Sequence, residues 1–273
     1  MTSMSPEFSI PVTSALMAVT LVYLWGWYRL RSLPDLVPVW RLTAFVSGVS
    51  VVWAATGSPL STLDHHLLTA HMAQHLLLMT VAAPLILLGA PAITLLHGLP
   101  EALVGWGLRP FLRCRAVQAL GEILAHPAFC WLASACVVIG WHVPALFEQG
   151  MQSAGWHTVE HACFLAAGIL FWWPVLQPWP SLVEQPRWGI PVYLFLATLP
   201  CDALAAFLTF CDRVVYRHYL SPHRFWGISP FADQECAGAL MWIWVMFAYL
   251  IPAAVVTLQM LSRQRQTSRV EAV

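Results

Sequence analysis

Charged side chains are scarce in this chain. Asp, Glu, Lys and Arg together make up 10% of its 273 residues, and lysine is absent. The formal net charge is zero and the sequence has no compact basic patch, which argues against nucleic-acid binding. Hydrophobic residues make up 59% of the chain and the mean hydropathy is +0.68, so it has more apolar surface than a soluble core of this size can bury. These values predict an all-α polytopic membrane protein.

The sequence also lacks internal repeats, low-complexity tracts and linkers long enough to separate domains, so residues 1–273 are expected to form a single integral membrane domain. No basic segment of a cleaved signal peptide precedes the first apolar run, which is therefore expected to remain as a span. A helix needs about 20 residues to cross about 30 Å of hydrocarbon. Seven segments qualify and predict a seven-transmembrane-helix bundle: 9–28, 39–57, 68–97, 127–147, 155–176, 188–211 and 236–260.

Arginine is unevenly distributed between the predicted loops. Basic residues are retained on the cytoplasmic side of a bacterial membrane. Ten arginines fall on one side of the predicted membrane and three on the other, so we expect the N-terminus outside and the C-terminus inside a bacterial inner (plasma) membrane. The ten are Arg29, Arg31, Arg41, Arg109, Arg113, Arg115, Arg187, Arg263, Arg265 and Arg269; the three, all in the sixth loop, are Arg213, Arg217 and Arg224.

Two pairs of histidines have helical spacing, His71 with His75 in HMAQH and His157 with His161 in HTVEH. Side chains at i and i+4 share one face of a helix. A lone membrane histidine is often only an interhelical hydrogen-bond donor. Ionisable groups inside a membrane are costly, however, so two matched pairs indicate a site. In the predicted topology both pairs lie at one depth in the outer half, and His142 in WHVP can reach that level.

The residue types around these pairs favour a transition metal. Imidazole suits copper, zinc and iron, whereas thioether selects cuprous copper. Met79 lies one turn below His75 and extends the histidine stripe to H-x3-H-x3-M, which favours copper, although a methionine in an apolar helix is usually plain packing. Met241 is also placed toward the outer side.

Two carboxylates lie within predicted spans near the same level. Glu160, next to His161, is placed to accept a hydrogen bond from an imidazole and so to orient it. Asp202 in LPCDALAAF is either a structural hydrogen-bond or ion-pair partner in the bundle or a proton acceptor.

Cysteine and proline add little chemistry. The seven cysteines form no C-x-x-C, and only a pairing of Cys211 with Cys236 across the sixth loop is left open. Pro84, Gly89 and Pro91 predict a kink in the third helix.

Three other functions fit parts of this pattern. HTVEH matches the H-x-x-E-H motif of zinc peptidases, in which Glu160 would be the general base, but HMAQH offers no matching carboxylate. Histidines on facing helices can also ligate haem, as in a membrane electron carrier. Polar groups in a helical bundle can mark an ion pathway as well. Zinc and haem are thus the alternatives to copper.

Four ordered motifs run from the second helix through the seventh: HMAQHLLLMTVAAPLILLGAP, WHVPALFEQG, HTVEHACFLAAGILFWWPVL and SPFADQECAGALMW. Together they resemble the multispanning CtaG-type cytochrome c oxidase assembly factor family. The matching positions are His71, Gln74, His75, Trp141, His142, Pro144, His157, Glu160, His161, Asp233, Gln234, Gly238 and Met241.

The resemblance implies an assembly factor, not an enzyme, that serves a haem-copper oxidase. Its expected partners are oxidase subunits, periplasmic copper donors and membrane lipid. Copper would bind an outer-leaflet histidine cluster and be inserted from there into the oxidase. The expected ligands are His71, His75, His157, His161, His142 and Met79, supported by Glu160, Asp202, Gln74 and Met241.

Overall fold

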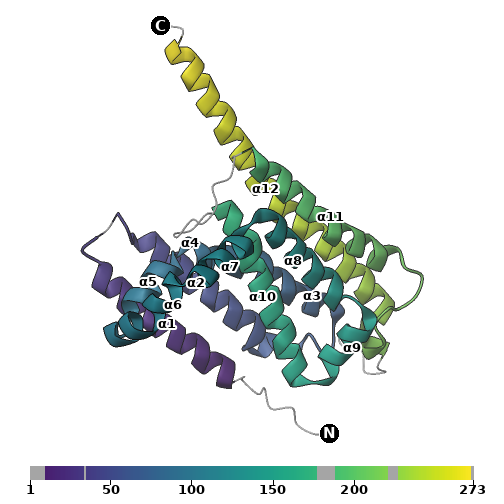
Figure 1. The fold of residues 1–273 in the computed structure, drawn as a ribbon. Coiled ribbons are helices and arrows are strands. Elements are labelled where there is room, and N and C mark those ends of the chain that lie inside the picture. The colour runs from purple at the N-terminus through teal and green to yellow at the C-terminus, as the bar shows by residue number, and fades with distance from the viewer. Residues whose placement is uncertain (1–9, 34, 177–187, 221–226, 272–273) are drawn as a thin grey trace.

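The computed structural model describes residues 10–33, 35–176, 188–220 and 227–271, and all regular secondary structure in these residues is helical. Figure 1 shows the helices side by side in one bundle, with the C-terminal helix extending well beyond it. Six helices in the described part are long and apolar enough to cross a membrane, and a bent pair makes a seventh candidate. The predicted all-α polytopic architecture is confirmed.

Four predicted spans match observed helices to within two residues at each described end. They are α1 (Ile10–Leu30), α2 (Val39–Thr56), α10 (Ala154–Leu176) and α11 (Gly189–Phe210). Residue 9, where the first span was expected to begin, lies outside the described residues, as do Arg187 and Arg224.

The third predicted span, 68–97, is wrong at its C-terminal end. It consists of α3 (Leu68–Leu77), a π-helical turn η2 (Leu78–Ala82) and α4 (Ala83–Leu88), and it ends at Leu88, just before Gly89. Ala90 has a left-handed φ of 48°, and a separate helix, α5 (Pro91–Gly98), then packs on α1. Pro91 disfavours a helical conformation at the residue before it, so the kink expected here is a complete break.

The fourth predicted span, 127–147, begins where the structure begins it but is wrong at its C-terminal end. The helix α8 (Pro127–Trp141) ends before Pro144, which begins the short helix α9 (Pro144–Gln152). At its other end α8 meets α7 (Arg115–Ala125) at a bend of 68°. Before α7 come the short π-helix η3 (Leu103–Leu108) and α6 (Arg109–Arg113).

The seventh predicted span, 236–260, is too short. The helix α12 (Pro230–Glu271) extends beyond it in both directions, because hydropathy marks only the apolar part of a helix whose ends are polar. The disulfide left open between Cys211 and Cys236 is absent; both cysteines are free, as are the other five.

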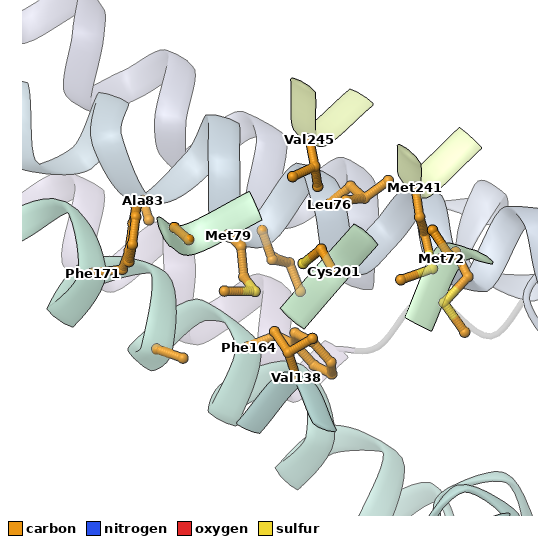
Figure 2. Packing of buried hydrophobic residues seen from close by; sticks show 14 of the residues in the cluster. Met72, Leu76, Met79, Ala83, Val138, Phe164, Phe171, Cys201, Met241 and Val245 are labelled. Atoms are coloured by element: carbon orange, nitrogen blue, oxygen red, sulfur yellow. The ribbon is translucent and has the colours of Figure 1, made fainter. Parts of the chain in front are cut away.

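The rod formed by α3, η2 and α4 is the centre of the bundle. Of the residues in its apolar 18-residue stretch, 61% are buried, more than in the other five single-helix candidates, and the rod contacts α2, α10 and α12. At Gly168 of α10 a Cβ atom would lie 2.8 Å from the Met79 Cα atom, so the missing side chain lets α10 approach η2 closely. The Met79 carbonyl in this π turn accepts a hydrogen bond from Trp172 Nε1 at 3.0 Å. Figure 2 shows the buried side chains at this contact, including Met79, Ala83 and Phe171.

Three connections meet at one end of the bundle: the segment with η1 (Pro59–Thr62) before α3, the helix α9, and the segment with η4 (Arg217–Leu220) before α12. The Tyr219 hydroxyl donates to the Asp64 carbonyl at 2.7 Å, and His218 Nε2 donates to the His65 carbonyl at 3.2 Å. The His218 backbone N–H donates to Glu148 Oε1 at 3.1 Å. These bonds tie the three connections together over the ends of α3 and α10.

Candidate metal centre

The two histidine pairs face each other across α3 and α10. The ring centroids of His71 and His157 lie 5.6 Å apart, and those of His75 and His161 also lie 5.6 Å apart. The two helices run in the same direction. The first histidines of the two pairs, His71 and His157, therefore lie together, and so do the second ones, His75 and His161. The two pairs, which the sequence placed at the same depth in the membrane, therefore form one cluster.

Three buried donor atoms converge at the centre of this cluster, here called the inner group: His71, His75 and Glu160. The two Nε2 atoms lie 2.8 Å apart, and Glu160 Oε1 lies 3.3 Å from that of His71 and 3.2 Å from that of His75. Donors about 2.0–2.1 Å from a tetrahedral metal lie about 3.3 Å from one another. The spacing of the inner group therefore fits one metal ion with little rearrangement.

Glu160 differs from its expected place. Sequence adjacency suggested that it would orient an imidazole, with His161 and His157 the nearest in the chain. It instead faces the pair on α3, with its carboxylate 1% exposed. Its position depends on Gly150 of α9, where a Cβ atom would lie 2.9 Å from Glu160 Oε2. The WHVPALFEQG motif thus brings α9 against this carboxylate.

A second set of donors, here called the outer group, consists of Asp64, His71 and His157. Asp64 Oδ2 lies 3.4 Å from His157 Nε2, and its Oδ1 lies 3.8 Å from Nε2 of the more exposed His65. The Asp64 side chain is fully buried, and burial raises the pKa of its carboxyl group. Sequence reasoning missed Asp64 because it lies in a connection rather than a span; its only signal was the run Asp64, His65, His66 just before HMAQH.

Unsatisfied polar atoms are concentrated around these two groups. Thirteen buried side-chain nitrogen and oxygen atoms of the described residues have no hydrogen-bond partner, and ten of them belong to this region. Buried polar atoms are otherwise almost always paired. In the outer group these atoms include Asp64 Oδ2 and His157 Nε2, which one bound cation would satisfy together. In the inner group they are His71 Nδ1, His75 Nδ1 and Glu160 Oε2, and not the three atoms that converge. The ten atoms belong to Asp64, His71, Gln74, His75, His142, His157, Glu160 and His161.

His142 ends α8 and lies beside the inner group. Its Nδ1 donates to the Val138 carbonyl at 2.6 Å, while its Nε2 is buried without a partner. The Tyr216 hydroxyl in turn donates to the His142 carbonyl at 3.1 Å. With His75, His142 lines a small cavity below the cluster, and this cavity also contains Met79 and Met241.

The remaining predicted residues have different positions. Asp202 belongs to neither donor group, and one of its carboxylate oxygens is buried without a partner next to Cys201 on α11. Gln74 precedes His75 on α3 and its side chain is buried. Neither Nε2 nor Oε1 of its carboxamide has a hydrogen-bond partner. His161 lies beside His75 but in neither three-residue group.

Asp233 and Gln234 of the SPFADQECAGALMW motif support the site from outside it, whereas Met241 of the same motif lines the cavity next to His75 and His142. The Asp233 carboxylate accepts the backbone N–H groups of Leu68 at 2.6 Å and Thr69 at 3.1 Å, and so caps α3 from another helix. The Gln234 carboxamide accepts the Val215 N–H at 2.7 Å and donates to the Arg213 carbonyl at 3.1 Å. These contacts fix the start of α3 and the connection that covers it.

Three mycobacterial proteins are similar to this chain. The uncharacterized proteins Mb0105 of Mycobacterium bovis and MT0111 of Mycobacterium tuberculosis are each 26% identical over 244 residues, which is 86% of this chain and 36% of theirs. The uncharacterized protein ML1998 of Mycobacterium leprae is 25% identical over 227 residues, or 81% of this chain and 34% of its own. The chain thus spans about a third of the length of these relatives, and no solved structure matches it.

The family comparison covers most of the chain. The sequence model of the cytochrome c oxidase caa3 assembly factor family (Caa3_CtaG) matches residues 21–263, a range that contains both donor groups and the four motifs. This chain, a multi-pass membrane protein, therefore belongs to the cytochrome c oxidase caa3 assembly factor family.

Proposed function

We propose that this protein binds copper as cargo at the inner group and helps to install it in a haem-copper oxidase subunit. The observation that carries the proposal is the convergence of His71, His75 and Glu160 to within 2.8–3.3 Å of one another, in a member of an oxidase assembly family. Imidazole nitrogens with one carboxylate suit a divalent transition ion, and the thioethers next to them extend the preference toward copper.

The outer group supplies a route for exchange. His65 is 42% exposed and its imidazole approaches the buried carboxylate of Asp64, which in turn contacts His157. An ion accepted at the surface by His65 and Asp64 would meet His71, which belongs to both groups. Transfer requires ligands that release the ion as well as bind it, and a chain of partly shared donors meets this requirement.

We propose that this end of the bundle faces outward, where copper donors and oxidase copper centres are accessible. Arg29, Arg109 and Arg113 line an open cavity of about 580 Å³ at the opposite end, whereas Arg213 and Arg217 lie in the connection at the end that holds the site. Basic residues are retained on the cytoplasmic side, so this asymmetry supports an outward-facing site in a bacterial inner membrane.

The geometry favours copper binding over a zinc peptidase site and over haem binding. In a peptidase of the H-x-x-E-H type, His157 and His161 would share a metal while Glu160 activated water; here neither donor group combines these histidines, and Glu160 lies at ligand distance from the other pair. A haem needs a flat slot between its axial ligands, whereas Phe164 stacks on His75 at 3.8 Å and the adjoining cavity has only about 20 Å³.

Metal analysis tests the proposal. The detergent-solubilised protein from copper-supplemented cells should retain copper, and the variant with His71, His75, His157 and His161 replaced by alanine should lose it. The control replaces two exposed histidines far from the cluster, His97→Ala with His126→Ala, and should keep its copper. In cells that lack the protein, only the wild type and the control should restore copper to the oxidase. Equal copper in wild type and quadruple variant would reject the proposal.

A further inference from the structure

The open cavity of about 580 Å³ contains none of the copper donors, and it lies at the boundary of the membrane. Its walls come from the end of α1, from α5, and from η3 and α6. Figure 1 shows α5 and α6 beside α1, at the side of the bundle away from α9. Arg29 is one of the lining residues and belongs to the last turn of the span α1. The end of a span is level with the lipid headgroups, so the cavity opens where headgroups lie.

The lining of this cavity is positively charged. It contains Arg29, Arg109, Arg113 and Glu101, three positive charges against one negative charge. Arg109 and Arg113 are four residues apart on α6 and so share one face of the helix. Arg29 Nη1 donates to the His97 carbonyl at 3.2 Å, which holds this guanidinium at the cavity. Among the residues that the structure describes, none of the three arginines forms an ion pair. Their charge is therefore left for an anion from outside the chain.

The rest of the cavity wall is largely apolar. Leu96, Leu99, Leu108 and Leu112 line it together with the arginines. The volume lies within the range of about 300–1,000 Å³ that is usual for ligand sites. A soluble anion such as phosphate gains nothing from an apolar wall, whereas a phospholipid combines a charged headgroup with hydrocarbon chains. The mixed lining thus favours a lipid.

The segment that closes the cavity is not part of the protein core. None of residues 103–124 is buried, although the segment is almost entirely helical. Trp106 of η3 is 90% exposed and Phe111 of α6 is 62% exposed. Exposed apolar patches mark surfaces that contact a membrane or a partner, and tryptophan is enriched at the membrane interface. These side chains are therefore placed to contact lipid beside the cavity.

The helix α7, which follows α6, has the pattern of a helix that lies along a membrane surface. Arg115, Gln118 and Glu122 are spaced i, i+3 and i+7 and share one face. Leu120 and Ile123, outside that face, are 54% and 57% exposed. A helix with one polar and one apolar face lies in the interface plane, and the bend of 68° directs α7 away from the axis of α8. The whole segment from η3 to α7 is thus suited to the headgroup level.

We propose that this cavity binds the headgroup of an anionic phospholipid. Its phosphate contacts Arg109 and Arg113, and its acyl chains lie against the apolar side chains of η3 and α6. Guanidinium groups bind phosphate oxygens through paired N–H donors, and basic pockets between membrane helices bind anionic headgroups. The bound lipid joins the weakly packed segment to the end of α1. The proposal is independent of copper, so its failure would leave the proposed function untouched.

Native mass spectrometry of the full-length protein in detergent, titrated with dioleoylphosphatidylglycerol, tests the site. The wild type should retain this lipid more tightly than the zwitterionic dioleoylphosphatidylcholine. The double variant Arg109→Gln, Arg113→Gln should bind phosphatidylglycerol on the order of 30-fold more weakly, because each basic residue near an anionic membrane surface contributes about fivefold. The matched control Arg31→Gln, Arg115→Gln removes two exposed arginines outside the cavity and should bind like the wild type.

A second arm of the experiment separates a lipid from a soluble phosphate. Inorganic phosphate at the same concentration should not displace phosphatidylglycerol, because it has no acyl chains to bind the apolar wall. Phosphatidylglycerol should also raise the thermal unfolding temperature of the wild type and the control more than phosphatidylcholine does. If the double variant does not fold, the single variant Arg109→Gln should weaken phosphatidylglycerol binding about fivefold.

Each contrary result overturns the lipid site for a different reason. Equal retention of the two lipids by the wild type would show that the cavity does not select an anion. Unchanged binding in the folded arginine variants would show that the lipid lies elsewhere. An equal loss in the control would mean that overall charge, rather than the cavity, attracts the lipid. Displacement by inorganic phosphate would identify a soluble anion as the ligand.

Discussion

The inner and outer groups share His71 but differ in almost every other respect. The inner group is closed: Glu160 is 1% exposed and its two histidine partners are 0% and 5% exposed. The outer group is covered only by connections, its His157 is 12% exposed, and it continues to the exposed His65. Its carboxylate comes from a connection instead of a helix. This difference is the reason for proposing that the inner group holds the ion and the outer group exchanges it.

The comparison also shows that the sequence pairs are not the sites. Each i, i+4 pair is a stripe on one helix, whereas each donor group combines residues from different segments. His71 and His75 stay together in the inner group, but His157 and His161 separate, since His157 faces Asp64 and His161 faces His75.

Replacement of Glu160 should give the largest effect. Glu160→Gln keeps the shape but removes the only carboxylate of the inner group, so copper affinity should fall on the order of 100-fold, at the upper end of the losses caused by changes around metal sites. Chelator competition on the purified protein measures this. The control Glu122→Gln changes a carboxylate on α7, outside both groups. An equal loss of copper affinity in the control would show that Glu160 has no special role.

Asp64→Asn should act mainly on exchange. The outer group would lose its charge while the inner group stayed complete, so we expect about a tenfold loss of affinity and a larger change in the rate of copper transfer to a chelator. Stopped-flow transfer measures the rate, with Asp35→Asn, an exposed aspartate in the first connection, as control. If affinity fell as far as in Glu160→Gln, the distinction between the two groups would be wrong.

Asp233→Ala should destabilise both groups equally. It removes the cap from α3, and losing such a cap costs about 1–2 kcal/mol. The thermal unfolding temperature of the detergent-solubilised protein should fall, whereas Asp212→Ala, at an exposed aspartate, should leave it unchanged. A variant of normal stability would show that α3 begins correctly without this contact.

Tyr219→Phe should have the smallest effect and be confined to the outer group. It removes one hydrogen bond, to the Asp64 carbonyl, worth about 0.5–1.5 kcal/mol. Copper transfer should change a few-fold while equilibrium binding at the inner group is retained. A strong loss of inner-group binding would mean that the covering connection supports both groups.

The sequence predicted the spans well where apolar runs are uninterrupted, as in α10 and α11. It failed where local chemistry overrides hydropathy. Pro91 ends the third span through the residue before it, and Pro144 ends the fourth in the same way. The polar ends of α12 gave no hydropathy signal, although they continue the helix.

The site was predicted in part for similar physical reasons. Helical spacing identified both histidine pairs, because periodicity along one helix is visible in sequence. The orientation of Glu160 toward α3, and the approach of Asp64 from a connection, depend on which helices are neighbours, and a single sequence contains no such information. The capping of α3 by Asp233, 164 or more residues away in the chain, is a contact of the same kind.

The X-ray absorption spectrum of protein loaded with one cupric equivalent tests the central claim most directly. The inner group predicts two imidazole ligands and one carboxylate oxygen at about 2.0–2.1 Å, and the imidazole scattering should vanish in the variant His71→Ala, His75→Ala. A spectrum without imidazole ligands, or one that this variant leaves unchanged, would contradict the account.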